Sequence, residues 1–264
     1  MSSAVEQHVI YQIANAPLRN YPFPHLYLEP VFPDSFYGSM RRLWPDASSL
    51  TSLATTGRVT PGDYAERFIL PFTKPEIEKL PQESREFWQD FHSWLLGERF
   101  LRALLDKFRP YVLKRFGSSI RHYSFDVDSL VVRDHVNYRL GPHTDAQHKL
   151  LSLLFYCPDD DSMKHLGTTI YTPIDPGFRC PGGPHYGHEM FDKVRTMEYR
   201  PNSLFAFFKT DNSFHGVEPI TDNGVLRDLL LYDVRVHGGE EPGAAPPAPG
   251  MGWRMLKKFF GAKS

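Results

Sequence analysis

Cysteine is scarce in this chain, with only Cys157 and Cys180 among its 264 residues. Two cysteines exclude the disulfide framework of a small secreted domain and suit a reducing compartment. An excess of either charge is also lacking, because 30 basic residues stand against 31 acidic ones. The whole-chain charge therefore gives no indication of a nucleic-acid partner, and we expect none.

Long apolar runs are missing as well. No stretch approaches the roughly 20 residues of a membrane-spanning helix, and the first residues lack the charged start and apolar stretch of a secretory signal. We therefore expect a cytoplasmic protein. Aromatic residues, in contrast, are plentiful, with 20 Phe, 13 Tyr and 4 Trp, and the length suffices for one large domain.

The first 120 residues predict a helical and irregular lead-in. Between residues 84 and 116, apolar side chains recur at three- and four-residue spacing, as in amphipathic helices that bury one face. Gly97 and Pro110 interrupt this pattern and predict a break rather than one rod. We assign these helices a structural role, packing against a sheet. Residues 50–67, rich in Thr and Gly, predict a loop.

From residue 121 the pattern changes to short β-rich runs separated by turn residues. Helices first and strands later, with turns of antiparallel type, predict an α+β domain with a mostly β core, arranged as a sandwich or jelly roll. We expect one domain over residues 1–236, with the jelly-roll core at 121–236. The predicted strands cover 130–132, 150–156, 168–171, 204–208, 214–220 and 225–236.

The composition shifts after residue 236. Residues 237–252 are rich in Pro, Gly and Ala and predict a linker, and residues 253–264 form a short basic, amphipathic tail. Such a tail could contact a membrane surface or a protein partner. A disordered end, or a tail packed on its own domain, is at least as good an interpretation.

The most specific feature of the sequence is a set of candidate metal ligands. His143 and Asp145 stand two residues apart, so on a strand their side chains point to one face. His215 follows 70 residues after Asp145. Two imidazoles and one carboxylate are the facial set that binds non-haem iron(II) and leaves positions open for oxygen chemistry. Because H-x-D alone arises easily by chance, an ordinary surface pair is the alternative, and the prediction depends on the whole set.

Arg227, twelve residues after His215, is the candidate for binding an acidic cosubstrate. The intervening Asp222-Asn223-Gly224 suits a three-residue hairpin loop with a left-handed glycine. In that register Pro219 faces Arg227, and the guanidinium enters the same cavity as His215. A two-residue loop would place it on the opposite face. We predict the three-residue register.

Together these elements resemble the iron(II)- and 2-oxoglutarate-dependent dioxygenases, in particular the prolyl-hydroxylase-like branch. The resemblance covers residues 130–236 and is carried by His143-x-Asp145, the strand Lys149 to Tyr156, Phe214-His215-Gly216-Val217 and Arg227. It implies a double-stranded β-helix, or jelly roll, with helices packed on one sheet. It also implies Fe(II), 2-oxoglutarate as cosubstrate and O2, with ascorbate as a further candidate cofactor.

The resemblance also implies roles for single residues. His143, Asp145 and His215 would be the iron ligands and the catalytic centre. Arg227 would bind the distal carboxylate of 2-oxoglutarate, and Tyr156 would hydrogen-bond the same carboxylate. A surface ion pair is the alternative for Arg227, and a core role is the alternative for Tyr156. The presence of Asp145 disfavours halogenation, because halogenases of this superfamily leave that ligand position empty.

The reaction that the resemblance implies is hydroxylation of an unactivated carbon. The Gly-Gly-Glu-Thr stretch common in prolyl hydroxylases is replaced here by Leu166-Gly167-Thr168-Thr169. We therefore slightly favour a small metabolite or saccharide-type substrate over a peptide. The alternatives are a peptidyl prolyl hydroxylase and a cupin-like sugar-binding protein or isomerase, although cupins usually use more histidines and need no counterpart of Arg227.

Two further groups of residues are weaker candidates. The Cys180 to His188 loop holds soft metal ligands, but its spacing matches no zinc pattern, and we expect an insertion near the mouth of the active site. Arg133, Tyr138, Arg139 and Lys149 could contact substrate, although surface or supporting roles fit them better.

Overall fold

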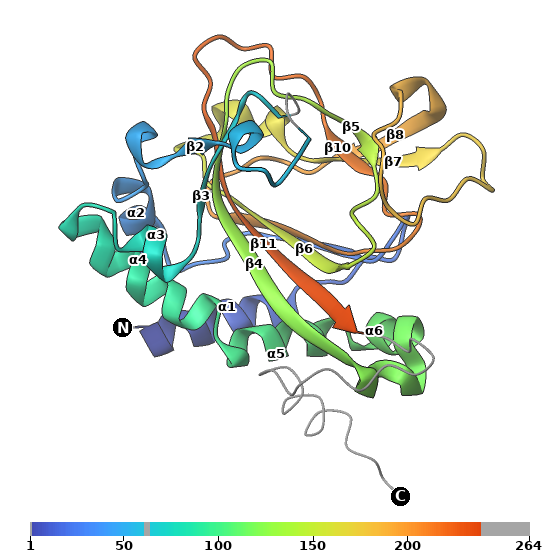
Figure 1. Cartoon of the computed structure of the whole chain (residues 1–264), viewed down its shortest axis with the longest axis horizontal. Coiled ribbons are helices and arrows are strands. Elements are labelled where there is room, and N and C mark those ends of the chain that lie inside the picture. Colours follow the sequence, from blue (N-terminus) through green and yellow to red (C-terminus); the bar gives the residue numbers. More distant parts are fainter. Residues whose placement is uncertain (1, 61–63, 239–264) are drawn as a thin grey trace, which may run out of the picture.

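In the computed structural model, which describes residues 2–60 and 64–238, two antiparallel sheets lie on one side of a layer of helices (Figure 1). Mostly antiparallel sheets with several helices make this an α+β fold, as predicted. Within the described ranges, none of the helices has the length and apolar character needed to span a bilayer. The predicted tail at 253–264, and the predicted linker from residue 239 on, lie outside the described residues.

The larger sheet has seven strands in the order β1–β9–β6–β11–β4–β3–β2. Three of them come from the predicted lead-in, which therefore contributes to the same sheet as the core. The bounds are His25–Leu28 (β1), Thr51–Ser52 (β2), Arg67–Pro71 (β3), Tyr123–Asp134 (β4), Lys149–Tyr156 (β6), Ser203–Phe208 (β9) and Arg227–Gly238 (β11).

The smaller sheet has four strands in the order β5–β10–β7–β8. All four are three to six residues long. Two of them, β5 and β8, match no strand predicted from the sequence. The bounds are Leu140–His143 (β5), Thr169–Pro173 (β7), Phe191–Thr196 (β8) and His215–Val217 (β10).

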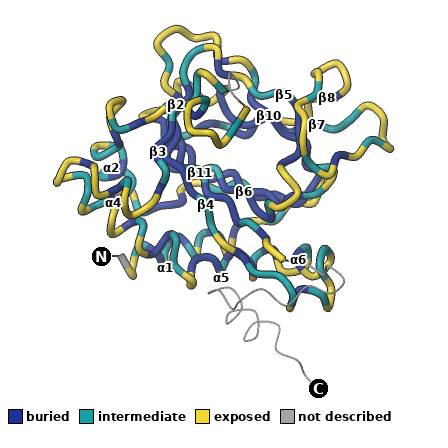
Figure 2. Tube along the Cα trace, in the orientation of Figure 1, coloured by how far each residue is buried: buried dark blue, intermediate teal, exposed yellow. Residues whose placement is uncertain are grey.

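The period-two alternation of β11 separates two cores. Leu230, Tyr232 and Val234 are buried in the cluster that contains the helices, whereas Leu229 is buried in a second cluster on the other face of the sheet. Alternate residues of a strand point to opposite faces. Odd-numbered residues of β11, from Arg227 to Arg235, therefore face the inner side of the larger sheet. Figure 2 shows β6 and β11, in the middle of the larger sheet, mostly in the dark blue of buried residues.

The helices cover the outer face of the larger sheet. Phe91, Leu95 and Leu104 are fully buried there, so the apolar stripe packs on a sheet as predicted. The break is also confirmed, because one helix ends before Gly97 and the next begins after it. The helices are Ser2–Asn15 (α1), Asp34–Arg42 (α2), Lys74–Ile77 (α3), Gln82–Leu95 (α4), Glu98–Lys107 (α5) and Arg109–Phe116 (α6), and the 3-10 turns are Ala47–Ser49, Leu53–Thr55, Gly117–His122, Asp161–Leu166 and His188–Met190.

The predicted hairpin between β10 and β11 is wrong. Gly224 does adopt a left-handed φ of +77°, and the Val225 N–H donates to the Asp222 carbonyl across 3.4 Å. However, β10 pairs with β5 and β7, whereas β11 pairs with β4 and β6 in the other sheet. The turn therefore carries the chain from one sheet to the other, and Pro219 does not pair with Arg227.

Candidate active site

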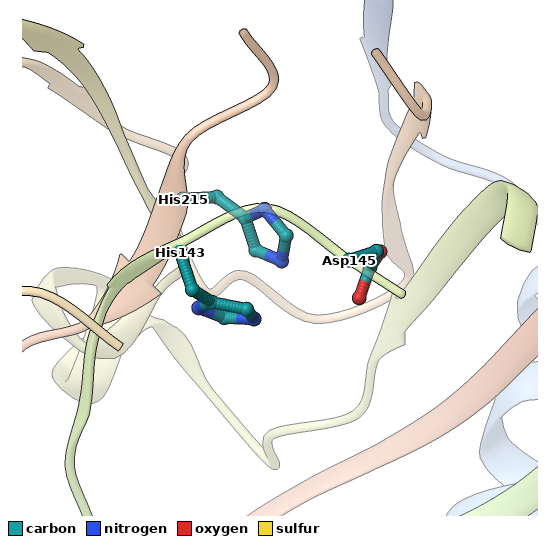
Figure 3. A group of neighbouring side chains, drawn as sticks. All are labelled: His143, Asp145 and His215. Atoms are coloured by element: carbon teal, nitrogen blue, oxygen red, sulfur yellow. The ribbon is translucent and has the colours of Figure 1, made fainter. Parts of the chain in front are cut away.

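The three predicted metal ligands converge at the edge of the smaller sheet. His143 ends β5 and His215 begins β10, and these two residues are direct partners across the antiparallel pair. Cross-strand partners carry their side chains on the same face. Asp145 follows β5 by two residues, and one ligand atom from each of the three side chains lies within 4.8 Å of the others (Figure 3).

Both imidazoles are oriented by backbone carbonyls. Nδ1 of His143 lies 3.0 Å from the Gly141 oxygen, and Nδ1 of His215 lies 2.9 Å from the Ser213 oxygen. A carbonyl only accepts, so each Nδ1 donates its hydrogen and each Nε2 keeps a lone pair. Burial lowers the pKa of both rings, which keeps them in the neutral form that binds metal.

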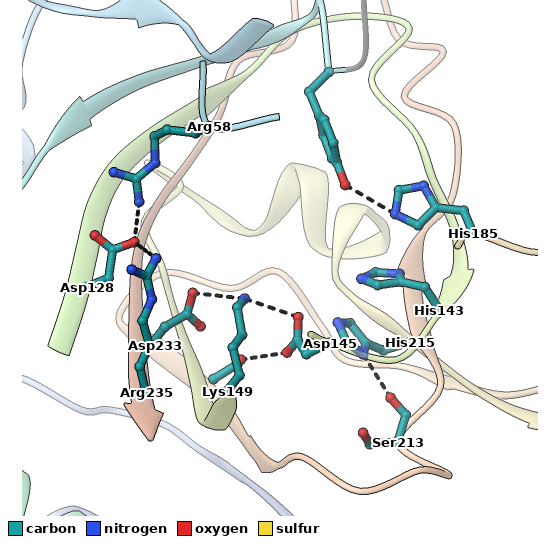
Figure 4. Close-up of polar contacts among 12 residues, drawn as sticks. Arg58, Asp128, His143, Asp145, Lys149, His185, Ser213, His215, Asp233 and Arg235 are labelled. Carbon is teal, nitrogen blue, oxygen red and sulfur yellow. Dashed lines mark hydrogen bonds and ion pairs between the residues drawn. The ribbon is translucent and has the colours of Figure 1, made fainter. Parts of the chain in front are cut away.

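The Asp145 carboxylate is held by two donors on β6. The Ser152 hydroxyl donates to Oδ2 across 2.7 Å, and the Lys149 ammonium lies 3.1 Å from Oδ1 (Figure 4). Burial acts to raise the pKa of Asp145, but Lys149, His215 and the other contacts outweigh it and hold that pKa well below its usual range. Lys149 also pairs with Asp233 across 2.9 Å. Lys149, in the sequence a weak candidate for substrate contact, thus positions the Asp145 carboxylate.

Arg227 lies on the facing sheet and belongs to a buried charge group. Its Nη1 donates to Asp134 across 2.7 Å, and its Nε donates to the Leu166 carbonyl across 2.7 Å. Arg67 binds the same Asp134 with two hydrogen bonds of 2.6 and 2.9 Å. Two cations therefore share one carboxylate, and one positive charge remains. Neither Arg67 nor Asp134 was a candidate in the sequence, where they lie 67 residues apart.

Beside this group, two buried polar atoms of cavity-lining residues lack a protein partner among the described residues: Nη2 of Arg227 and Oγ1 of Thr168. The hydroxyl of Tyr156 accepts from the Thr168 N–H across 3.0 Å, so its own hydrogen remains available. Buried donors without acceptors cost free energy. Their convergence indicates a ligand that brings acceptor oxygens, such as a carboxylate.

A cavity of about 380 Å³ connects these parts. Its lining includes the three ligand residues together with Arg227 and Thr168. The segment at 50–67, which contains β2 and a 3-10 turn besides the predicted loop, also contributes, through Arg58, Val59 and Tyr64. The loop at 180–188 contributes Gly183 and His185. The 180–188 loop was predicted to lie near the mouth of the active site, and its place in the cavity lining agrees with that prediction. In the part of the chain that the structure describes, the triad is the one group of His, Cys, Asp and Glu side chains placed to share a metal ion.

The remaining sequence candidates do not reach the metal ligands. Arg133 pairs with Asp228 across 2.7 Å, and neither residue lines the cavity. Arg139 lines a separate hollow. Tyr138 is fully buried behind the site, with the Arg67 guanidinium 4.3 Å from its ring centre. These residues therefore support the architecture rather than line the reaction space.

No family model and no curated protein matches this chain. Several solved structures are similar. HygX from Streptomyces hygroscopicus, with nickel, 2-oxoglutarate and hygromycin B bound, is 12% identical over 80% of this chain and 82% of that chain, with a TM-score of 0.45. A Pseudomonas putida prolyl-4-hydroxylase is 14% identical over 89% and 98%, with a TM-score of 0.43. The non-haem alpha-ketoglutarate-dependent epimerase SnoN from nogalamycin biosynthesis is 10% identical over 94% and 92%, with a TM-score of 0.49.

These names agree with the resemblance seen in the sequence. With identities of 10 to 14% and TM-scores of 0.43 to 0.49, however, the likeness does not assign a reaction or a substrate. The chemistry of this chain must be argued from its own side chains.

Proposed function

We propose that this chain is an iron(II)- and 2-oxoglutarate-dependent oxygenase of the prolyl-hydroxylase-like branch, and that its two sheets form a double-stranded β-helix. It hydroxylates an unactivated carbon of a small metabolite or saccharide-type substrate. The observation that carries the proposal is the convergence of His143, Asp145 and His215 on a cavity that also contains Arg227. The cytoplasmic location stays a prediction from the sequence.

The ligand set fits iron(II). Two neutral imidazole nitrogens and one carboxylate oxygen can occupy one face of the ion and leave the opposite face to the cavity. When bound, iron(II) supplies the activation of oxygen that the side chains alone cannot perform. The protein orients the ligands: backbone carbonyls fix both imidazoles, and Ser152 and Lys149 fix the carboxylate.

The charge group around Arg227 fits the distal carboxylate of 2-oxoglutarate. A carboxylate there would neutralise the positive charge left by Arg67, Asp134 and Arg227. It would also accept from Nη2 of Arg227 and from Oγ1 of Thr168, two atoms that otherwise stay buried without an acceptor in the described structure. The hydroxyl of Tyr156 is placed as a third donor.

Part of the cavity wall is apolar and would help to exclude water from the reacting groups. Leucines from three neighbouring strands form an apolar floor, and the hydroxyl of Tyr64 and Nε2 of His185 lie 3.1 Å apart across the mouth. Excluding water strengthens electrostatic contacts inside and suppresses side reactions. The three leucines are Leu130, Leu154 and Leu231.

Anaerobic addition of Fe(II) and 2-oxoglutarate tests the proposal, with the visible charge-transfer band of the chelate as the signal. We expect the band in wild-type protein and its loss in His143→Ala. Wild-type protein that is folded and reconstituted but shows no band would contradict the proposal.

A separate variant tests the cosubstrate contact. Thr168→Val keeps the shape of the side chain and removes the unpartnered hydroxyl, so we expect the Kd of 2-oxoglutarate to rise about tenfold. Thr169→Val is the matched control, because the neighbouring hydroxyl bonds to Thr196 across 2.9 Å instead. Equal Kd values for the two variants would exclude Thr168 from the cosubstrate site.

The type of reaction is then read from the products. Succinate release in the presence of candidate metabolites reports coupled turnover, and mass spectrometry of the substrate separates two outcomes. Hydroxylation adds one oxygen atom, whereas epimerisation leaves the mass unchanged. We expect the added oxygen.

A further inference from the structure

A second group of two arginines and one aspartate lies further along the same pair of strands, β4 and β11. Arg58 and Arg235 both donate through Nη2 to Oδ2 of Asp128 (Figure 4). All three residues line the cavity that contains the metal ligands. As in the group around Arg227, two cations share one carboxylate.

This second group is too far away to hold the same molecule of 2-oxoglutarate. Arg227 and Arg235 lie eight residues apart on β11 and face the same side, which corresponds to about 26 Å of strand. A five-carbon diacid does not span that distance. The group is nevertheless connected to the metal site, because Lys149 bridges Asp145 and the neighbouring Asp233.

Two polar atoms at this end have no hydrogen-bond partner in the described structure. Nε of Arg235 is a buried donor, and Oδ1 of Asp233 is a buried acceptor whose side chain is only 5% exposed. Both residues line the cavity. A ligand with an anionic oxygen and a nearby hydroxyl or ammonium group would supply both partners.

The charge of the whole cavity supports an anionic ligand. Five cations line it, and they face three lining carboxylates and the buried Asp134 behind Arg227. One positive charge remains, and bound iron(II) would raise the excess to three. The dianion 2-oxoglutarate removes two of these charges, so one negative charge on the substrate would balance the site. The cations are Arg58, Arg67, Lys149, Arg227 and Arg235, and the lining carboxylates are Asp128, Asp145 and Asp233.

We propose that the Arg58–Asp128–Arg235 group binds an anionic group of the substrate, a carboxylate or a phosphate, while Asp233 accepts from a neighbouring hydroxyl or ammonium group. This inference rests on the proposed function, which supplies the type of reaction. The charge of the ligand is inferred from the Arg58–Asp128–Arg235 group alone. The favoured small-metabolite substrate is thereby narrowed to small organic acids and phosphate esters that carry a hydroxyl or amino group.

Calorimetric titration of inorganic phosphate into the metal-free, full-length protein tests the site independently of iron and 2-oxoglutarate. In the double variant Arg58→Gln/Arg235→Gln we expect phosphate to bind about tenfold to a hundredfold more weakly, because two charged donors are lost. Arg200→Gln is the matched control, since Arg200 pairs with Asp161 and does not line the cavity. We expect wild-type affinity there.

Asp128→Asn gives an expectation of the opposite sign. Without the competing carboxylate, both guanidinium groups are free for the ligand, so phosphate should bind about tenfold more tightly than in wild-type protein. Misfolding cannot produce tighter binding, so this variant separates loss of the site from loss of the fold. Unchanged affinity in both the double variant and Asp128→Asn would overturn the proposal.

Turnover then distinguishes the sources of the anion. Succinate release is compared for hydroxy or amino acids, for the corresponding phosphate esters and for neutral amides of the same size. We expect an anionic series to be active, with a KM about tenfold higher in the double variant and an unchanged Kd of 2-oxoglutarate. Neutral amides that work equally well would overturn the proposal, whereas loss of 2-oxoglutarate binding in the double variant would assign the group to the cosubstrate instead.

Discussion

At the scale of single residues, the Asp145 carboxylate has the most closely determined surroundings. Ser152 occupies one oxygen and Lys149 the other, and both donors come from the adjacent strand β6. Partners of this kind set the orientation and basicity of a metal ligand. In the proposed metal site, they would hold the Asp145 carboxylate in the orientation that binds the ion.

Removal of the Ser152 hydroxyl should therefore weaken the metal site. For Ser152→Ala we expect a Kd for Mn(II), used as a redox-stable substitute for iron, that is about 10 to 100 times higher. Ser129→Ala serves as the control. The Ser129 side chain lies on the face of the sheet opposite the cavity, and its hydroxyl donates to the Leu231 carbonyl instead of to Asp145. Equal affinity of the two variants for Mn(II) would show that the hydroxyl does not support the ligand.

The histidines predict a pH dependence of the metal-free protein. The pKa of His143 lies well below 6.5 in the folded state, mainly because the ring is buried and also because His215 is close. Above pH 6.5 the ring is neutral in both states and the stability is fully present. Below pH 6.5, the ring is protonated in the unfolded chain but stays neutral in the folded chain. The free energy of unfolding therefore falls as the pH falls, by up to about 1.4 kcal/mol per pH unit for each such ring.

Urea unfolding at about pH 7.5 and about pH 5.5 measures this effect. We expect the loss of stability on acidification to be smaller in His143→Gln than in wild-type protein. The pKa of His25 and of His148 is also lowered by burial, but these rings are present in both proteins and cancel in the comparison. An identical pH dependence would contradict the assigned shift.

At the scale of elements, the loop at 180–188 packs on the segment that carries Asp145. The Thr144 hydroxyl donates to the Cys180 carbonyl across 2.8 Å, and the Tyr186 N–H donates to the Pro142 carbonyl across 2.9 Å. At Gly182 the two chains approach so closely that an added Cβ would lie 2.6 Å from the Asp145 carbonyl oxygen. The loop thus fixes the position of Asp145, a proposed metal ligand, as well as the edge of the cavity mouth.

Gly182→Ala should displace this segment, whereas Gly183→Ala should not. Both glycines have a positive φ, of 135° and 141°, so both variants carry similar backbone strain. Only Gly182 lacks space, because nothing lies within 4 Å of a Cβ at Gly183. We expect Mn(II) affinity to fall at least about tenfold further in Gly182→Ala than in Gly183→Ala. Similar affinities would show that the segment shifts without moving the ligand.

At the scale of the whole molecule, the site joins the two sheets. His143 and His215 come from the smaller sheet, whereas Ser152 and Arg227 come from the larger one. A metal ion together with an acidic cosubstrate would therefore connect both sheets across the cavity. Ligands that bind only the folded state stabilise it by mass action.

Metal and cosubstrate should accordingly raise the melting temperature together. With each ligand at 100 times its Kd, we expect about 2.7 kcal/mol of stabilisation from each of the two, or a rise of about 5 to 10 °C per ligand for a chain of this size. Anaerobic calorimetry with Mn(II) and 2-oxoglutarate measures the shift. His143→Ala should show little of it, and an equal shift in that variant would mean that the ligands stabilise the protein elsewhere.

Much of the architecture follows from local patterns. The three- and four-residue spacing and Gly97 predicted the helices and their break, and alternating apolar runs predicted most of the long strands. Short strands such as β5 and β8 were not predicted from the sequence. β5 contains Gly and Pro, and the middle residues of β8 are exposed, so neither strand has an alternating apolar pattern. Their pairing comes from neighbouring strands rather than from their own composition.

The residue types of His143, Asp145 and His215 already limit the chemistry to that of a candidate metal site, and the two-residue spacing keeps the first two close although Asp145 lies beyond the end of β5. The folded chain alone shows that β10 and β11 lie in different sheets, so that Arg227 reaches the cavity from the facing sheet. It alone revealed Asp134 between Arg67 and Arg227, and Asp128 between Arg58 and Arg235. The physical reason is that these ion pairs join residues 67 to 107 positions apart, and side chains so distant meet only when the sheets have formed.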